Sequence, residues 1–154
     1  MTTQLTLIQI DNYGPWTVTP EPRREMDLQT LQSRLFADIA QFVGSRGGYV
    51  FFSRFDNMIA VTNGIGRAGH KSLQESVRNR YPVTVSLGIG TAETPAAALD
   101  AATEQIQAAG SAQDKSRTEV LAGEPLDGDA DATTHMAHFD VNDATGKYTD
   151  QLNE

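Results

Sequence analysis

The chain has 154 residues, with 20 acidic residues against 12 basic ones and a formal net charge of −8. This length is enough for one ordinary domain with a sizeable core. The acidic balance argues against a general nucleic-acid binder, because counterion release at a phosphate backbone needs a basic surface. The absence of cysteine excludes disulfides and thiolate metal sites, so any metal must be held by oxygen or by histidine.

No stretch approaches eighteen consecutive apolar residues, and the N-terminus lacks the basic start and cleavage site of a signal peptide. We therefore expect a cytoplasmic protein that does not associate with membranes. Aspartate outnumbers glutamate and lysine is scarce, a composition that suits a salt-rich cytoplasm and favours a halophilic source. An ordinary acidic protein is the alternative explanation.

The first half of the chain predicts a strand, a helix and a hairpin. An apolar run over 5–10 predicts a strand that ends directly before Asp11, and a loop with two prolines follows. Apolar residues at spacings of three and four predict an amphipathic helix over 24–43. Two strands, 49–54 and 58–62, joined tightly at 55–57, are typical of a β-hairpin. We expect its phenylalanines, Phe51, Phe52 and Phe55, in the core.

The next elements complete a familiar order. A helix is predicted over 67–80, a strand over 83–90, and an alanine-rich helix that begins at Pro95 with Thr94 as its N-cap and ends at Gly110. The order β-α-β-β-α-β with an added helix predicts an α+β, ferredoxin-like fold. In that fold the first and third strands are central neighbours, so Asp11 and Asp56 should lie close together at one edge.

Residues 123–135 are polar and acidic and are expected to form a linker or loop. The segment 136–150 then repeats the opening pattern, a strand that ends on Asp140, with Asp143 three residues later. This divides the chain into a first domain over 1–122, the linker, and the first strand of an incomplete second unit over 136–154.

Two carboxylates at neighbouring strand ends, one of them on a hairpin, are typical of the metal site of nucleotidyl-transfer palm domains. Mg²⁺ prefers hard oxygen ligands, often one or two carboxylates together with substrate phosphates. The alternative is that Asp56-Asn57 simply suits a hairpin turn and that Asp11 ends a strand.

Several longer runs resemble the archaeal GTP cyclohydrolase III family, also called GTP cyclohydrolase IIa, from about residue 4 to residue 150. The runs are DNYGPWTVTPEPRRE, LQTLQSRLFADI, FFSRFDNMIAVTNGI, HKSLQESVRNRYPVTVS, AETPAAALDAATE and GSAQDKSRTEVL. The family is similar in fold to the palm domains of nucleotide cyclases and polymerases and carries two tandem copies of that unit. The resemblance implies a Mg²⁺-dependent enzyme, activated by K⁺, that opens the imidazole ring of GTP, keeps the formyl group and releases inorganic phosphate.

The resemblance also implies site residues. Asp11, Asp56 and the backbone carbonyl of Asn12 would hold the metal, and a further set would bind phosphate: Tyr13, Gly14, Arg23, Arg24, Arg54 and Lys115. Each arginine could equally serve a surface or helix-end role. Tyr13 and Trp16 could stack on guanine or could serve only in packing. The general base is unknown.

The sequence departs from the family in its second unit. Asp140 and Asp143 match the strand-end carboxylates of that unit, where they are possible metal ligands, but its glycine-rich hairpin has no counterpart here. Two hypotheses follow, a GTP cyclohydrolase or a catalytically incomplete GTP-binding module that needs a partner chain or the missing half. A palm-class nucleotide cyclase is a third, disfavoured because the hairpin has the sequence RFDN. An open sheet edge and a half-finished repeat favour a homo-oligomer.

Overall fold

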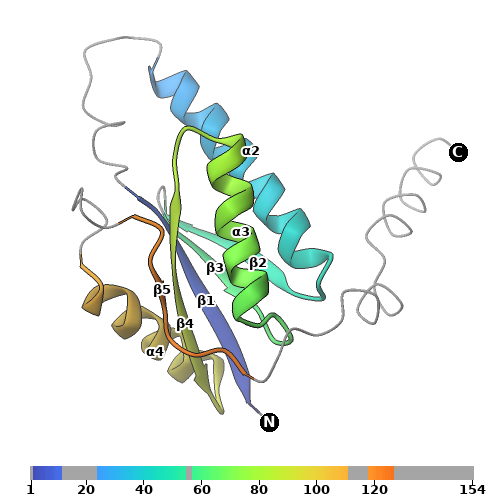
Figure 1. Ribbon diagram of the computed structural model, residues 1–154, viewed down its shortest axis with the longest axis vertical. Coiled ribbons are helices and arrows are strands. Elements are labelled where there is room, and N and C mark those ends of the chain that lie inside the picture. Colours follow the sequence, from blue (N-terminus) through green and yellow to red (C-terminus); the bar gives the residue numbers. More distant parts are fainter. Residues whose placement is uncertain (1, 12–23, 55–56, 111–117, 127–154) are drawn as a thin grey trace, which may run out of the picture.

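The strands and helices follow the chain in the predicted order in a computed structural model that describes residues 2–11, 24–54, 57–110 and 118–126 (Figure 1). Their bounds are β1 Thr3–Ile10, α2 Arg24–Gly44, β2 Tyr49–Arg54, β3 Asn57–Val61, α3 Arg67–Arg80, β4 Val85–Ala92, α4 Pro95–Ala108 and β5 Leu121–Ala122. The strand predicted over 83–90 therefore begins and ends two residues later than expected. In the part of the chain described, no helix is long and apolar enough to span a membrane.

The five strands form one sheet in the order β2-β3-β1-β4-β5. β1 runs antiparallel to both of its neighbours, β3 and β4, at the centre of the sheet. This arrangement confirms the ferredoxin-like α+β fold and the central pairing of the first and third strands. The short strand β5, which the sequence did not predict, extends the sheet by pairing parallel with β4.

Helices cover both faces of the sheet (Figure 1). Alternate residues of β1 point to opposite faces, so Ile8 and Ile10 join the main core under α2 and α3 while Leu7 packs with Ile106 of α4. Thr94 caps α4 as predicted, because its hydroxyl accepts a hydrogen bond from the backbone N–H of Ala97 at 3.2 Å.

The aromatic residues of β2 are not in the core, and the prediction that placed Phe51 and Phe52 there is wrong. Their exposed fractions are 57% and 49%, and that of Tyr49 is 63%. The physical reason is position, because β2 is the outermost strand of the sheet and α4 packs mainly on β4 and β1. Phe55 lies outside the described residues.

A buried polar network joins the other end of β1 to α3. The ring of His70 contacts the hydroxyl of Thr6 at 2.7 Å and the carbonyl of Gly66 at 2.7 Å. Gln4 donates to the carbonyl of Thr62 at 2.8 Å and accepts from the backbone N–H of Leu126 at 2.7 Å. These contacts give His70 a structural role and bring the last described residues against the sheet.

Candidate functional site

One end of the sheet gathers segments that are far apart in the sequence. The backbone pairings place Ile10 opposite Val85 and Gln9 opposite Asn57. This end of the sheet therefore holds the end of β1, the start of β4, the end of β2 and the start of β3. Asp56 itself lies outside the described residues, so its distance from Asp11 remains a prediction.

Asp11 is buried at this end, with only 4% of its surface exposed. Its Oδ2 accepts hydrogen bonds from the Thr84 hydroxyl at 2.8 Å and the backbone N–H of Glu119 at 2.9 Å. Its Oδ1 accepts one from the Ser86 hydroxyl at 2.6 Å. An ionised carboxylate is an acceptor only, so three donors suit its charged form and fix its orientation.

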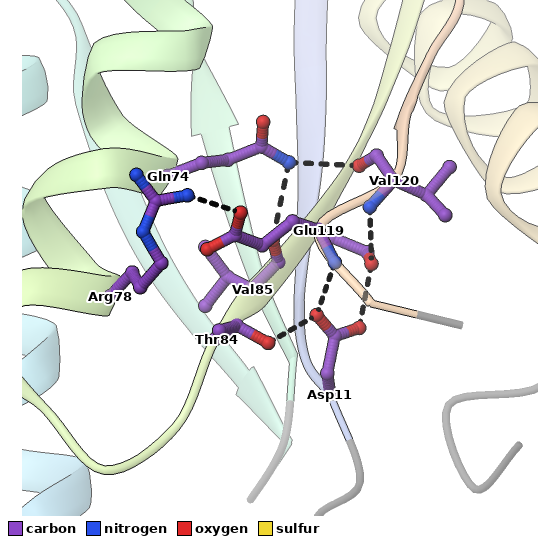
Figure 2. A network of polar contacts seen from close by, with 8 residues as sticks. Asp11, Gln74, Arg78, Thr84, Val85, Glu119 and Val120 are labelled. Carbon is purple, nitrogen blue, oxygen red and sulfur yellow. Dashed lines mark hydrogen bonds and ion pairs between the residues drawn. The ribbon is translucent and has the colours of Figure 1, made fainter. Parts of the chain in front are cut away.

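Further hydrogen bonds fix the groups that bind the Asp11 carboxylate. Ser86 accepts a hydrogen bond from the backbone N–H of Val120 at 3.0 Å while its own proton goes to Asp11. Gln74 of α3 donates to the carbonyls of Val85 at 3.2 Å and Val120 at 2.9 Å (Figure 2). The carboxylate thus links β1 to β4 and to the segment that leads into β5, under the cover of α3.

Glu119 has an unusual conformation beside this carboxylate. Its φ is +49°, in the left-handed region that residues other than glycine, asparagine and aspartate seldom adopt. Its Oε2 binds Arg78 at 2.7 Å, and its Oε1 is buried without a hydrogen-bond partner. Sequence reasoning missed Glu119, Thr84 and Ser86, because their contacts with Asp11 span from 73 to 108 residues of chain.

The remaining predicted site residues fall into two groups: those whose backbone alone is described, and those that lie outside the described residues. Arg24 begins α2 and Arg54 ends β2, both towards the same end of the sheet as Asp11, but their side chains are not described. The others lie outside the described residues: Asn12, Tyr13, Gly14, Arg23, Asp56, Lys115, Asp140 and Asp143. Their roles stay predictions. The segment that contains Lys115 connects α4 to Thr118, one residue before Glu119 at this site.

The donor chemistry at this end fits a magnesium ion that takes few protein ligands. Asp11 offers hard, anionic oxygens in a fixed position, and Mg²⁺ commonly uses one or two carboxylates and completes its octahedron with water and phosphate. Within the described ranges no three acidic or histidine side chains cluster closely enough to hold a metal on their own. A second carboxylate would have to come from a residue such as Asp56.

A solved structure shares the fold of this chain. The GGDEF domain of DgcB from Caulobacter crescentus, determined in complex with c-di-GMP, aligns with a TM-score of 0.55 over 79% of this chain and 77% of that one. At 12% identity this similarity concerns the fold alone. The similarity and the strand order together show a ferredoxin-like α+β fold of the palm type.

Sequence comparison then identifies the family. A family model described as GTP cyclohydrolase III matches residues 2–153, and the chain belongs to that family. It is 70% identical over 154 residues to GTP cyclohydrolase III of Natronomonas pharaonis and 58% identical over 149 residues to that of Methanocaldococcus jannaschii. It is also 69% identical over 153 residues to GTP cyclohydrolase III of the haloarchaeon Halorubrum lacusprofundi.

The chain is shorter than these relatives. The alignments cover 99% of this chain with the Natronomonas and Halorubrum proteins but only 61% and 60% of those proteins. With the Methanocaldococcus protein they cover 96% of this chain and 54% of the relative. The chain therefore spans somewhat more than half the length of its curated relatives.

Proposed function

We propose that this chain acts in a magnesium-dependent GTP cyclohydrolase. The reaction would hydrolyse GTP to 2-amino-5-formylamino-6-(5-phospho-ribosylamino)pyrimidin-4(3H)-one and inorganic phosphate, opening the imidazole ring with retention of the formyl group. The observation that supports it most is the family match over residues 2–153, together with a buried, oriented carboxylate at the strand end where a palm-type fold would need one.

The residues around Asp11 suggest how such a site would work. When bound, Mg²⁺ would neutralise phosphate charge and polarise phosphate oxygens. Asp11 would hold the ion together with Asp56 and the backbone carbonyl of Asn12. Thr84 and Ser86 keep the Asp11 carboxylate in one orientation before any ligand arrives, the usual task of groups behind a metal ligand.

The proposal also includes residues that bind the triphosphate of GTP and activation by K⁺. Tyr13, Gly14 and the basic side chains Arg23, Arg24, Arg54 and Lys115 would bind the triphosphate, since guanidinium groups can hold two phosphate oxygens at once. K⁺ would activate the enzyme, in keeping with the haloarchaeal relatives. The group that activates water for attack on the ring is unassigned.

A second candidate function is a GTP-binding palm module that is incomplete as a catalyst. The coverage motivates it, because the alignments span only 61%, 60% and 54% of three relatives named GTP cyclohydrolase III. In that case the chain would bind GTP with Mg²⁺ and would require a partner chain, or the missing half, for turnover.

Both candidates are tested by a turnover assay on the 154-residue chain in Mg²⁺ and high KCl, with ultraviolet absorbance and released phosphate followed together. We expect both signals to change, and Asp11→Asn to lower both rates by about a hundredfold, the scale of losses at metal sites. Asp100→Asn is the control, because Asp100 is exposed on α4 away from this end of the sheet.

Each result has a separate meaning. Binding of GTP without either signal supports the incomplete module, and recovery on adding the missing half would establish it. Full activity in Asp11→Asn, with an unchanged circular dichroism spectrum, would show that Asp11 is not a metal ligand. A lack of GTP binding in the unmodified chain would contradict both candidates.

A further inference from the structure

Glu119 combines two unfavourable features in one residue. Its φ of +49° brings its Cβ close to the following carbonyl oxygen, and within the described ranges it is the one residue other than glycine with a positive φ. Its Oε1 is buried without a hydrogen-bond partner. Such features persist only where the surrounding structure imposes them, and they gather at functional sites. The conformation of Glu119 therefore requires a physical explanation.

Contacts of its side chain and of the next residue hold this conformation. The Oε2 of Glu119 forms an ion pair with Arg78 of α3 at 2.7 Å (Figure 2). The next residue, Val120, donates its backbone N–H to the Ser86 hydroxyl at 3.0 Å, and its carbonyl accepts a hydrogen bond from Gln74 at 2.9 Å. Both the side chain and the following peptide group are fixed to neighbouring elements, so the backbone between them has little freedom to relax.

This conformation directs two successive backbone N–H groups to one carboxylate. The N–H of Glu119 donates to Oδ2 of Asp11 at 2.9 Å. The N–H of Val120 donates to the Ser86 hydroxyl, which in turn donates to Oδ1 of Asp11 at 2.6 Å. In an extended strand successive N–H groups point to opposite sides, whereas a left-handed residue lets neighbouring N–H groups converge on an anion. The short segment 119–120 therefore holds both oxygens of Asp11, one directly and one through Ser86.

We propose that Glu119 is a positioning residue for the metal site: its left-handed backbone aims the two N–H groups at Asp11, and its ion pair with Arg78 maintains that backbone. The inference rests on the proposed role of Asp11 as a metal ligand. A carboxylate that is already fixed at both oxygens needs less reorganisation when an ion binds, which is how groups behind a metal ligand raise the affinity for the ion. Glu119 acts through Asp11 and does not need to touch the ion or the nucleotide.

Two substitutions separate the backbone of residue 119 from its side chain. Glu119→Gly and Glu119→Ala both remove the ion pair with Arg78, but only glycine adopts a positive φ without steric cost. We expect Glu119→Ala to weaken the binding of Mn²⁺, a paramagnetic ion that shares the preference of Mg²⁺ for oxygen ligands, by about tenfold or more. Glu119→Gly should retain more of the affinity. Glu119→Gln should bind nearly as well as the unmodified chain, because its amide oxygen can still accept a hydrogen bond from Arg78.

Electron paramagnetic resonance of the free Mn²⁺ measures these affinities on the 154-residue chain. Glu93→Ala is the matched control for the loss of one negative charge, because Glu93 is exposed and follows β4 at the end of the sheet away from Asp11. It should leave the Mn²⁺ affinity unchanged. Hydrogen exchange without metal is the second readout, and the amides of residues 119 and 120 should be better protected in Glu119→Gly than in Glu119→Ala. A purely structural role would lower the unfolding free energy of the variants but leave their Mn²⁺ affinity unchanged, which would overturn the proposal.

The same assay on Asp11→Asn separates this inference from the proposed function. If Asp11→Asn loses Mn²⁺ binding while Glu119→Ala binds like the unmodified chain, Asp11 is a ligand and the positioning role of Glu119 is wrong. Equal losses in Glu119→Gly and Glu119→Ala would also overturn that role, because the backbone conformation would then not matter. If Asp11→Asn binds Mn²⁺ as tightly as the unmodified chain, or neither binds it, the proposed metal site fails and the positioning role fails with it. Should Glu119→Ala alter the circular dichroism spectrum, Arg78→Met takes its place, and unchanged Mn²⁺ affinity in that variant would overturn the proposal.

Discussion

At the scale of single residues, Asp11 gains its position from groups that lie far away in the sequence. Three hydrogen-bond donors to its carboxylate come from the start of β4 and from the segment before β5. One of them, the Ser86 hydroxyl, also accepts a hydrogen bond from the backbone N–H of Val120. Ser86 therefore binds the buried Asp11 carboxylate and the partly buried backbone N–H of Val120 at once.

Replacing Ser86 with alanine should lower the free energy of unfolding by about 1–3 kcal/mol, because a partly buried backbone N–H and a buried carboxylate oxygen each lose a partner. Urea unfolding measures this change. Ser72→Ala on the exposed surface of α3 is the control, expected to stay within about 0.5 kcal/mol. If the two variants were equally stable, the Ser86 hydrogen bonds would not contribute to folding. In the proposed enzyme, Ser86→Ala should also weaken Mg²⁺ binding, which a purely structural role would not do.

Tyr81 makes the free energy of unfolding depend on pH in the alkaline range. Partial burial, the hydrogen bond that its hydroxyl donates to Asp38 and the negative charge of Asp38 raise the pKa of Tyr81 from 10.0 to about 12. Since the pKa is higher in the folded state, the protonated phenol stabilises the fold. That contribution is fully present below pH 10 and is lost as the pH rises from 10 to about 12.

Spectrophotometric titration of phenolate absorbance should therefore show one tyrosine that ionises near pH 12, and Tyr81→Phe should remove that step. The same substitution should flatten the fall in unfolding free energy between pH 10 and pH 12. A wild-type chain whose tyrosines all titrate near pH 10 would contradict the assigned contact with Asp38.

At the scale of secondary-structure elements, the approach of α4 to β4 depends on two glycines of that strand. A Cβ built at Gly90 would lie 2.1 Å from the carbonyl oxygen of Ala98, and one at Gly88 would lie 2.6 Å from that of Ala102. Both obstacles are helix backbone, which cannot move aside without shifting α4. The helix in turn covers Leu7 of β1, so the glycines allow this side of the core to form.

Gly90→Ala should accordingly destabilise the protein by about 1–3 kcal/mol or more, the usual cost of overpacking. Gly44→Ala at the end of α2 is the matched control, because a Cβ there meets nothing within 4 Å. That change should be neutral or slightly stabilising, since alanine reduces the freedom of the unfolded chain. Thermal unfolding of both variants checks the expectation, and equal melting temperatures would show that α4 can shift without loss.

At the scale of the whole molecule, the sheet has two very different edges. On one side β5 extends the sheet beyond β4, and Gly123 follows it with a φ of +92° against the backbone of Ile89. On the other side β2 ends the described sheet with three exposed aromatic rings. The sheet therefore covers β4 with β5 on one side and leaves aromatic surface exposed at β2 on the other.

The sequence by itself determined what depends on local pattern. Periodicity and turn residues predicted the order β-α-β-β-α-β, the Thr94 cap and a strand that ends on Asp11, because neighbouring residues decide these features. Longer runs also identified the family, and with it the predicted metal and phosphate ligands.

The tertiary structure alone decided which residues lie at an edge and which distant groups meet. Phe51 and Phe52 have the pattern of core residues, yet strand order leaves them outermost, and composition cannot reveal strand order. Thr84, Ser86 and Glu119 converge on Asp11 only when β4 and the segment before β5 pair beside β1. The physical reason is that burial and hydrogen bonding across a sheet depend on neighbours in space, whereas a sequence pattern records only neighbours along the chain.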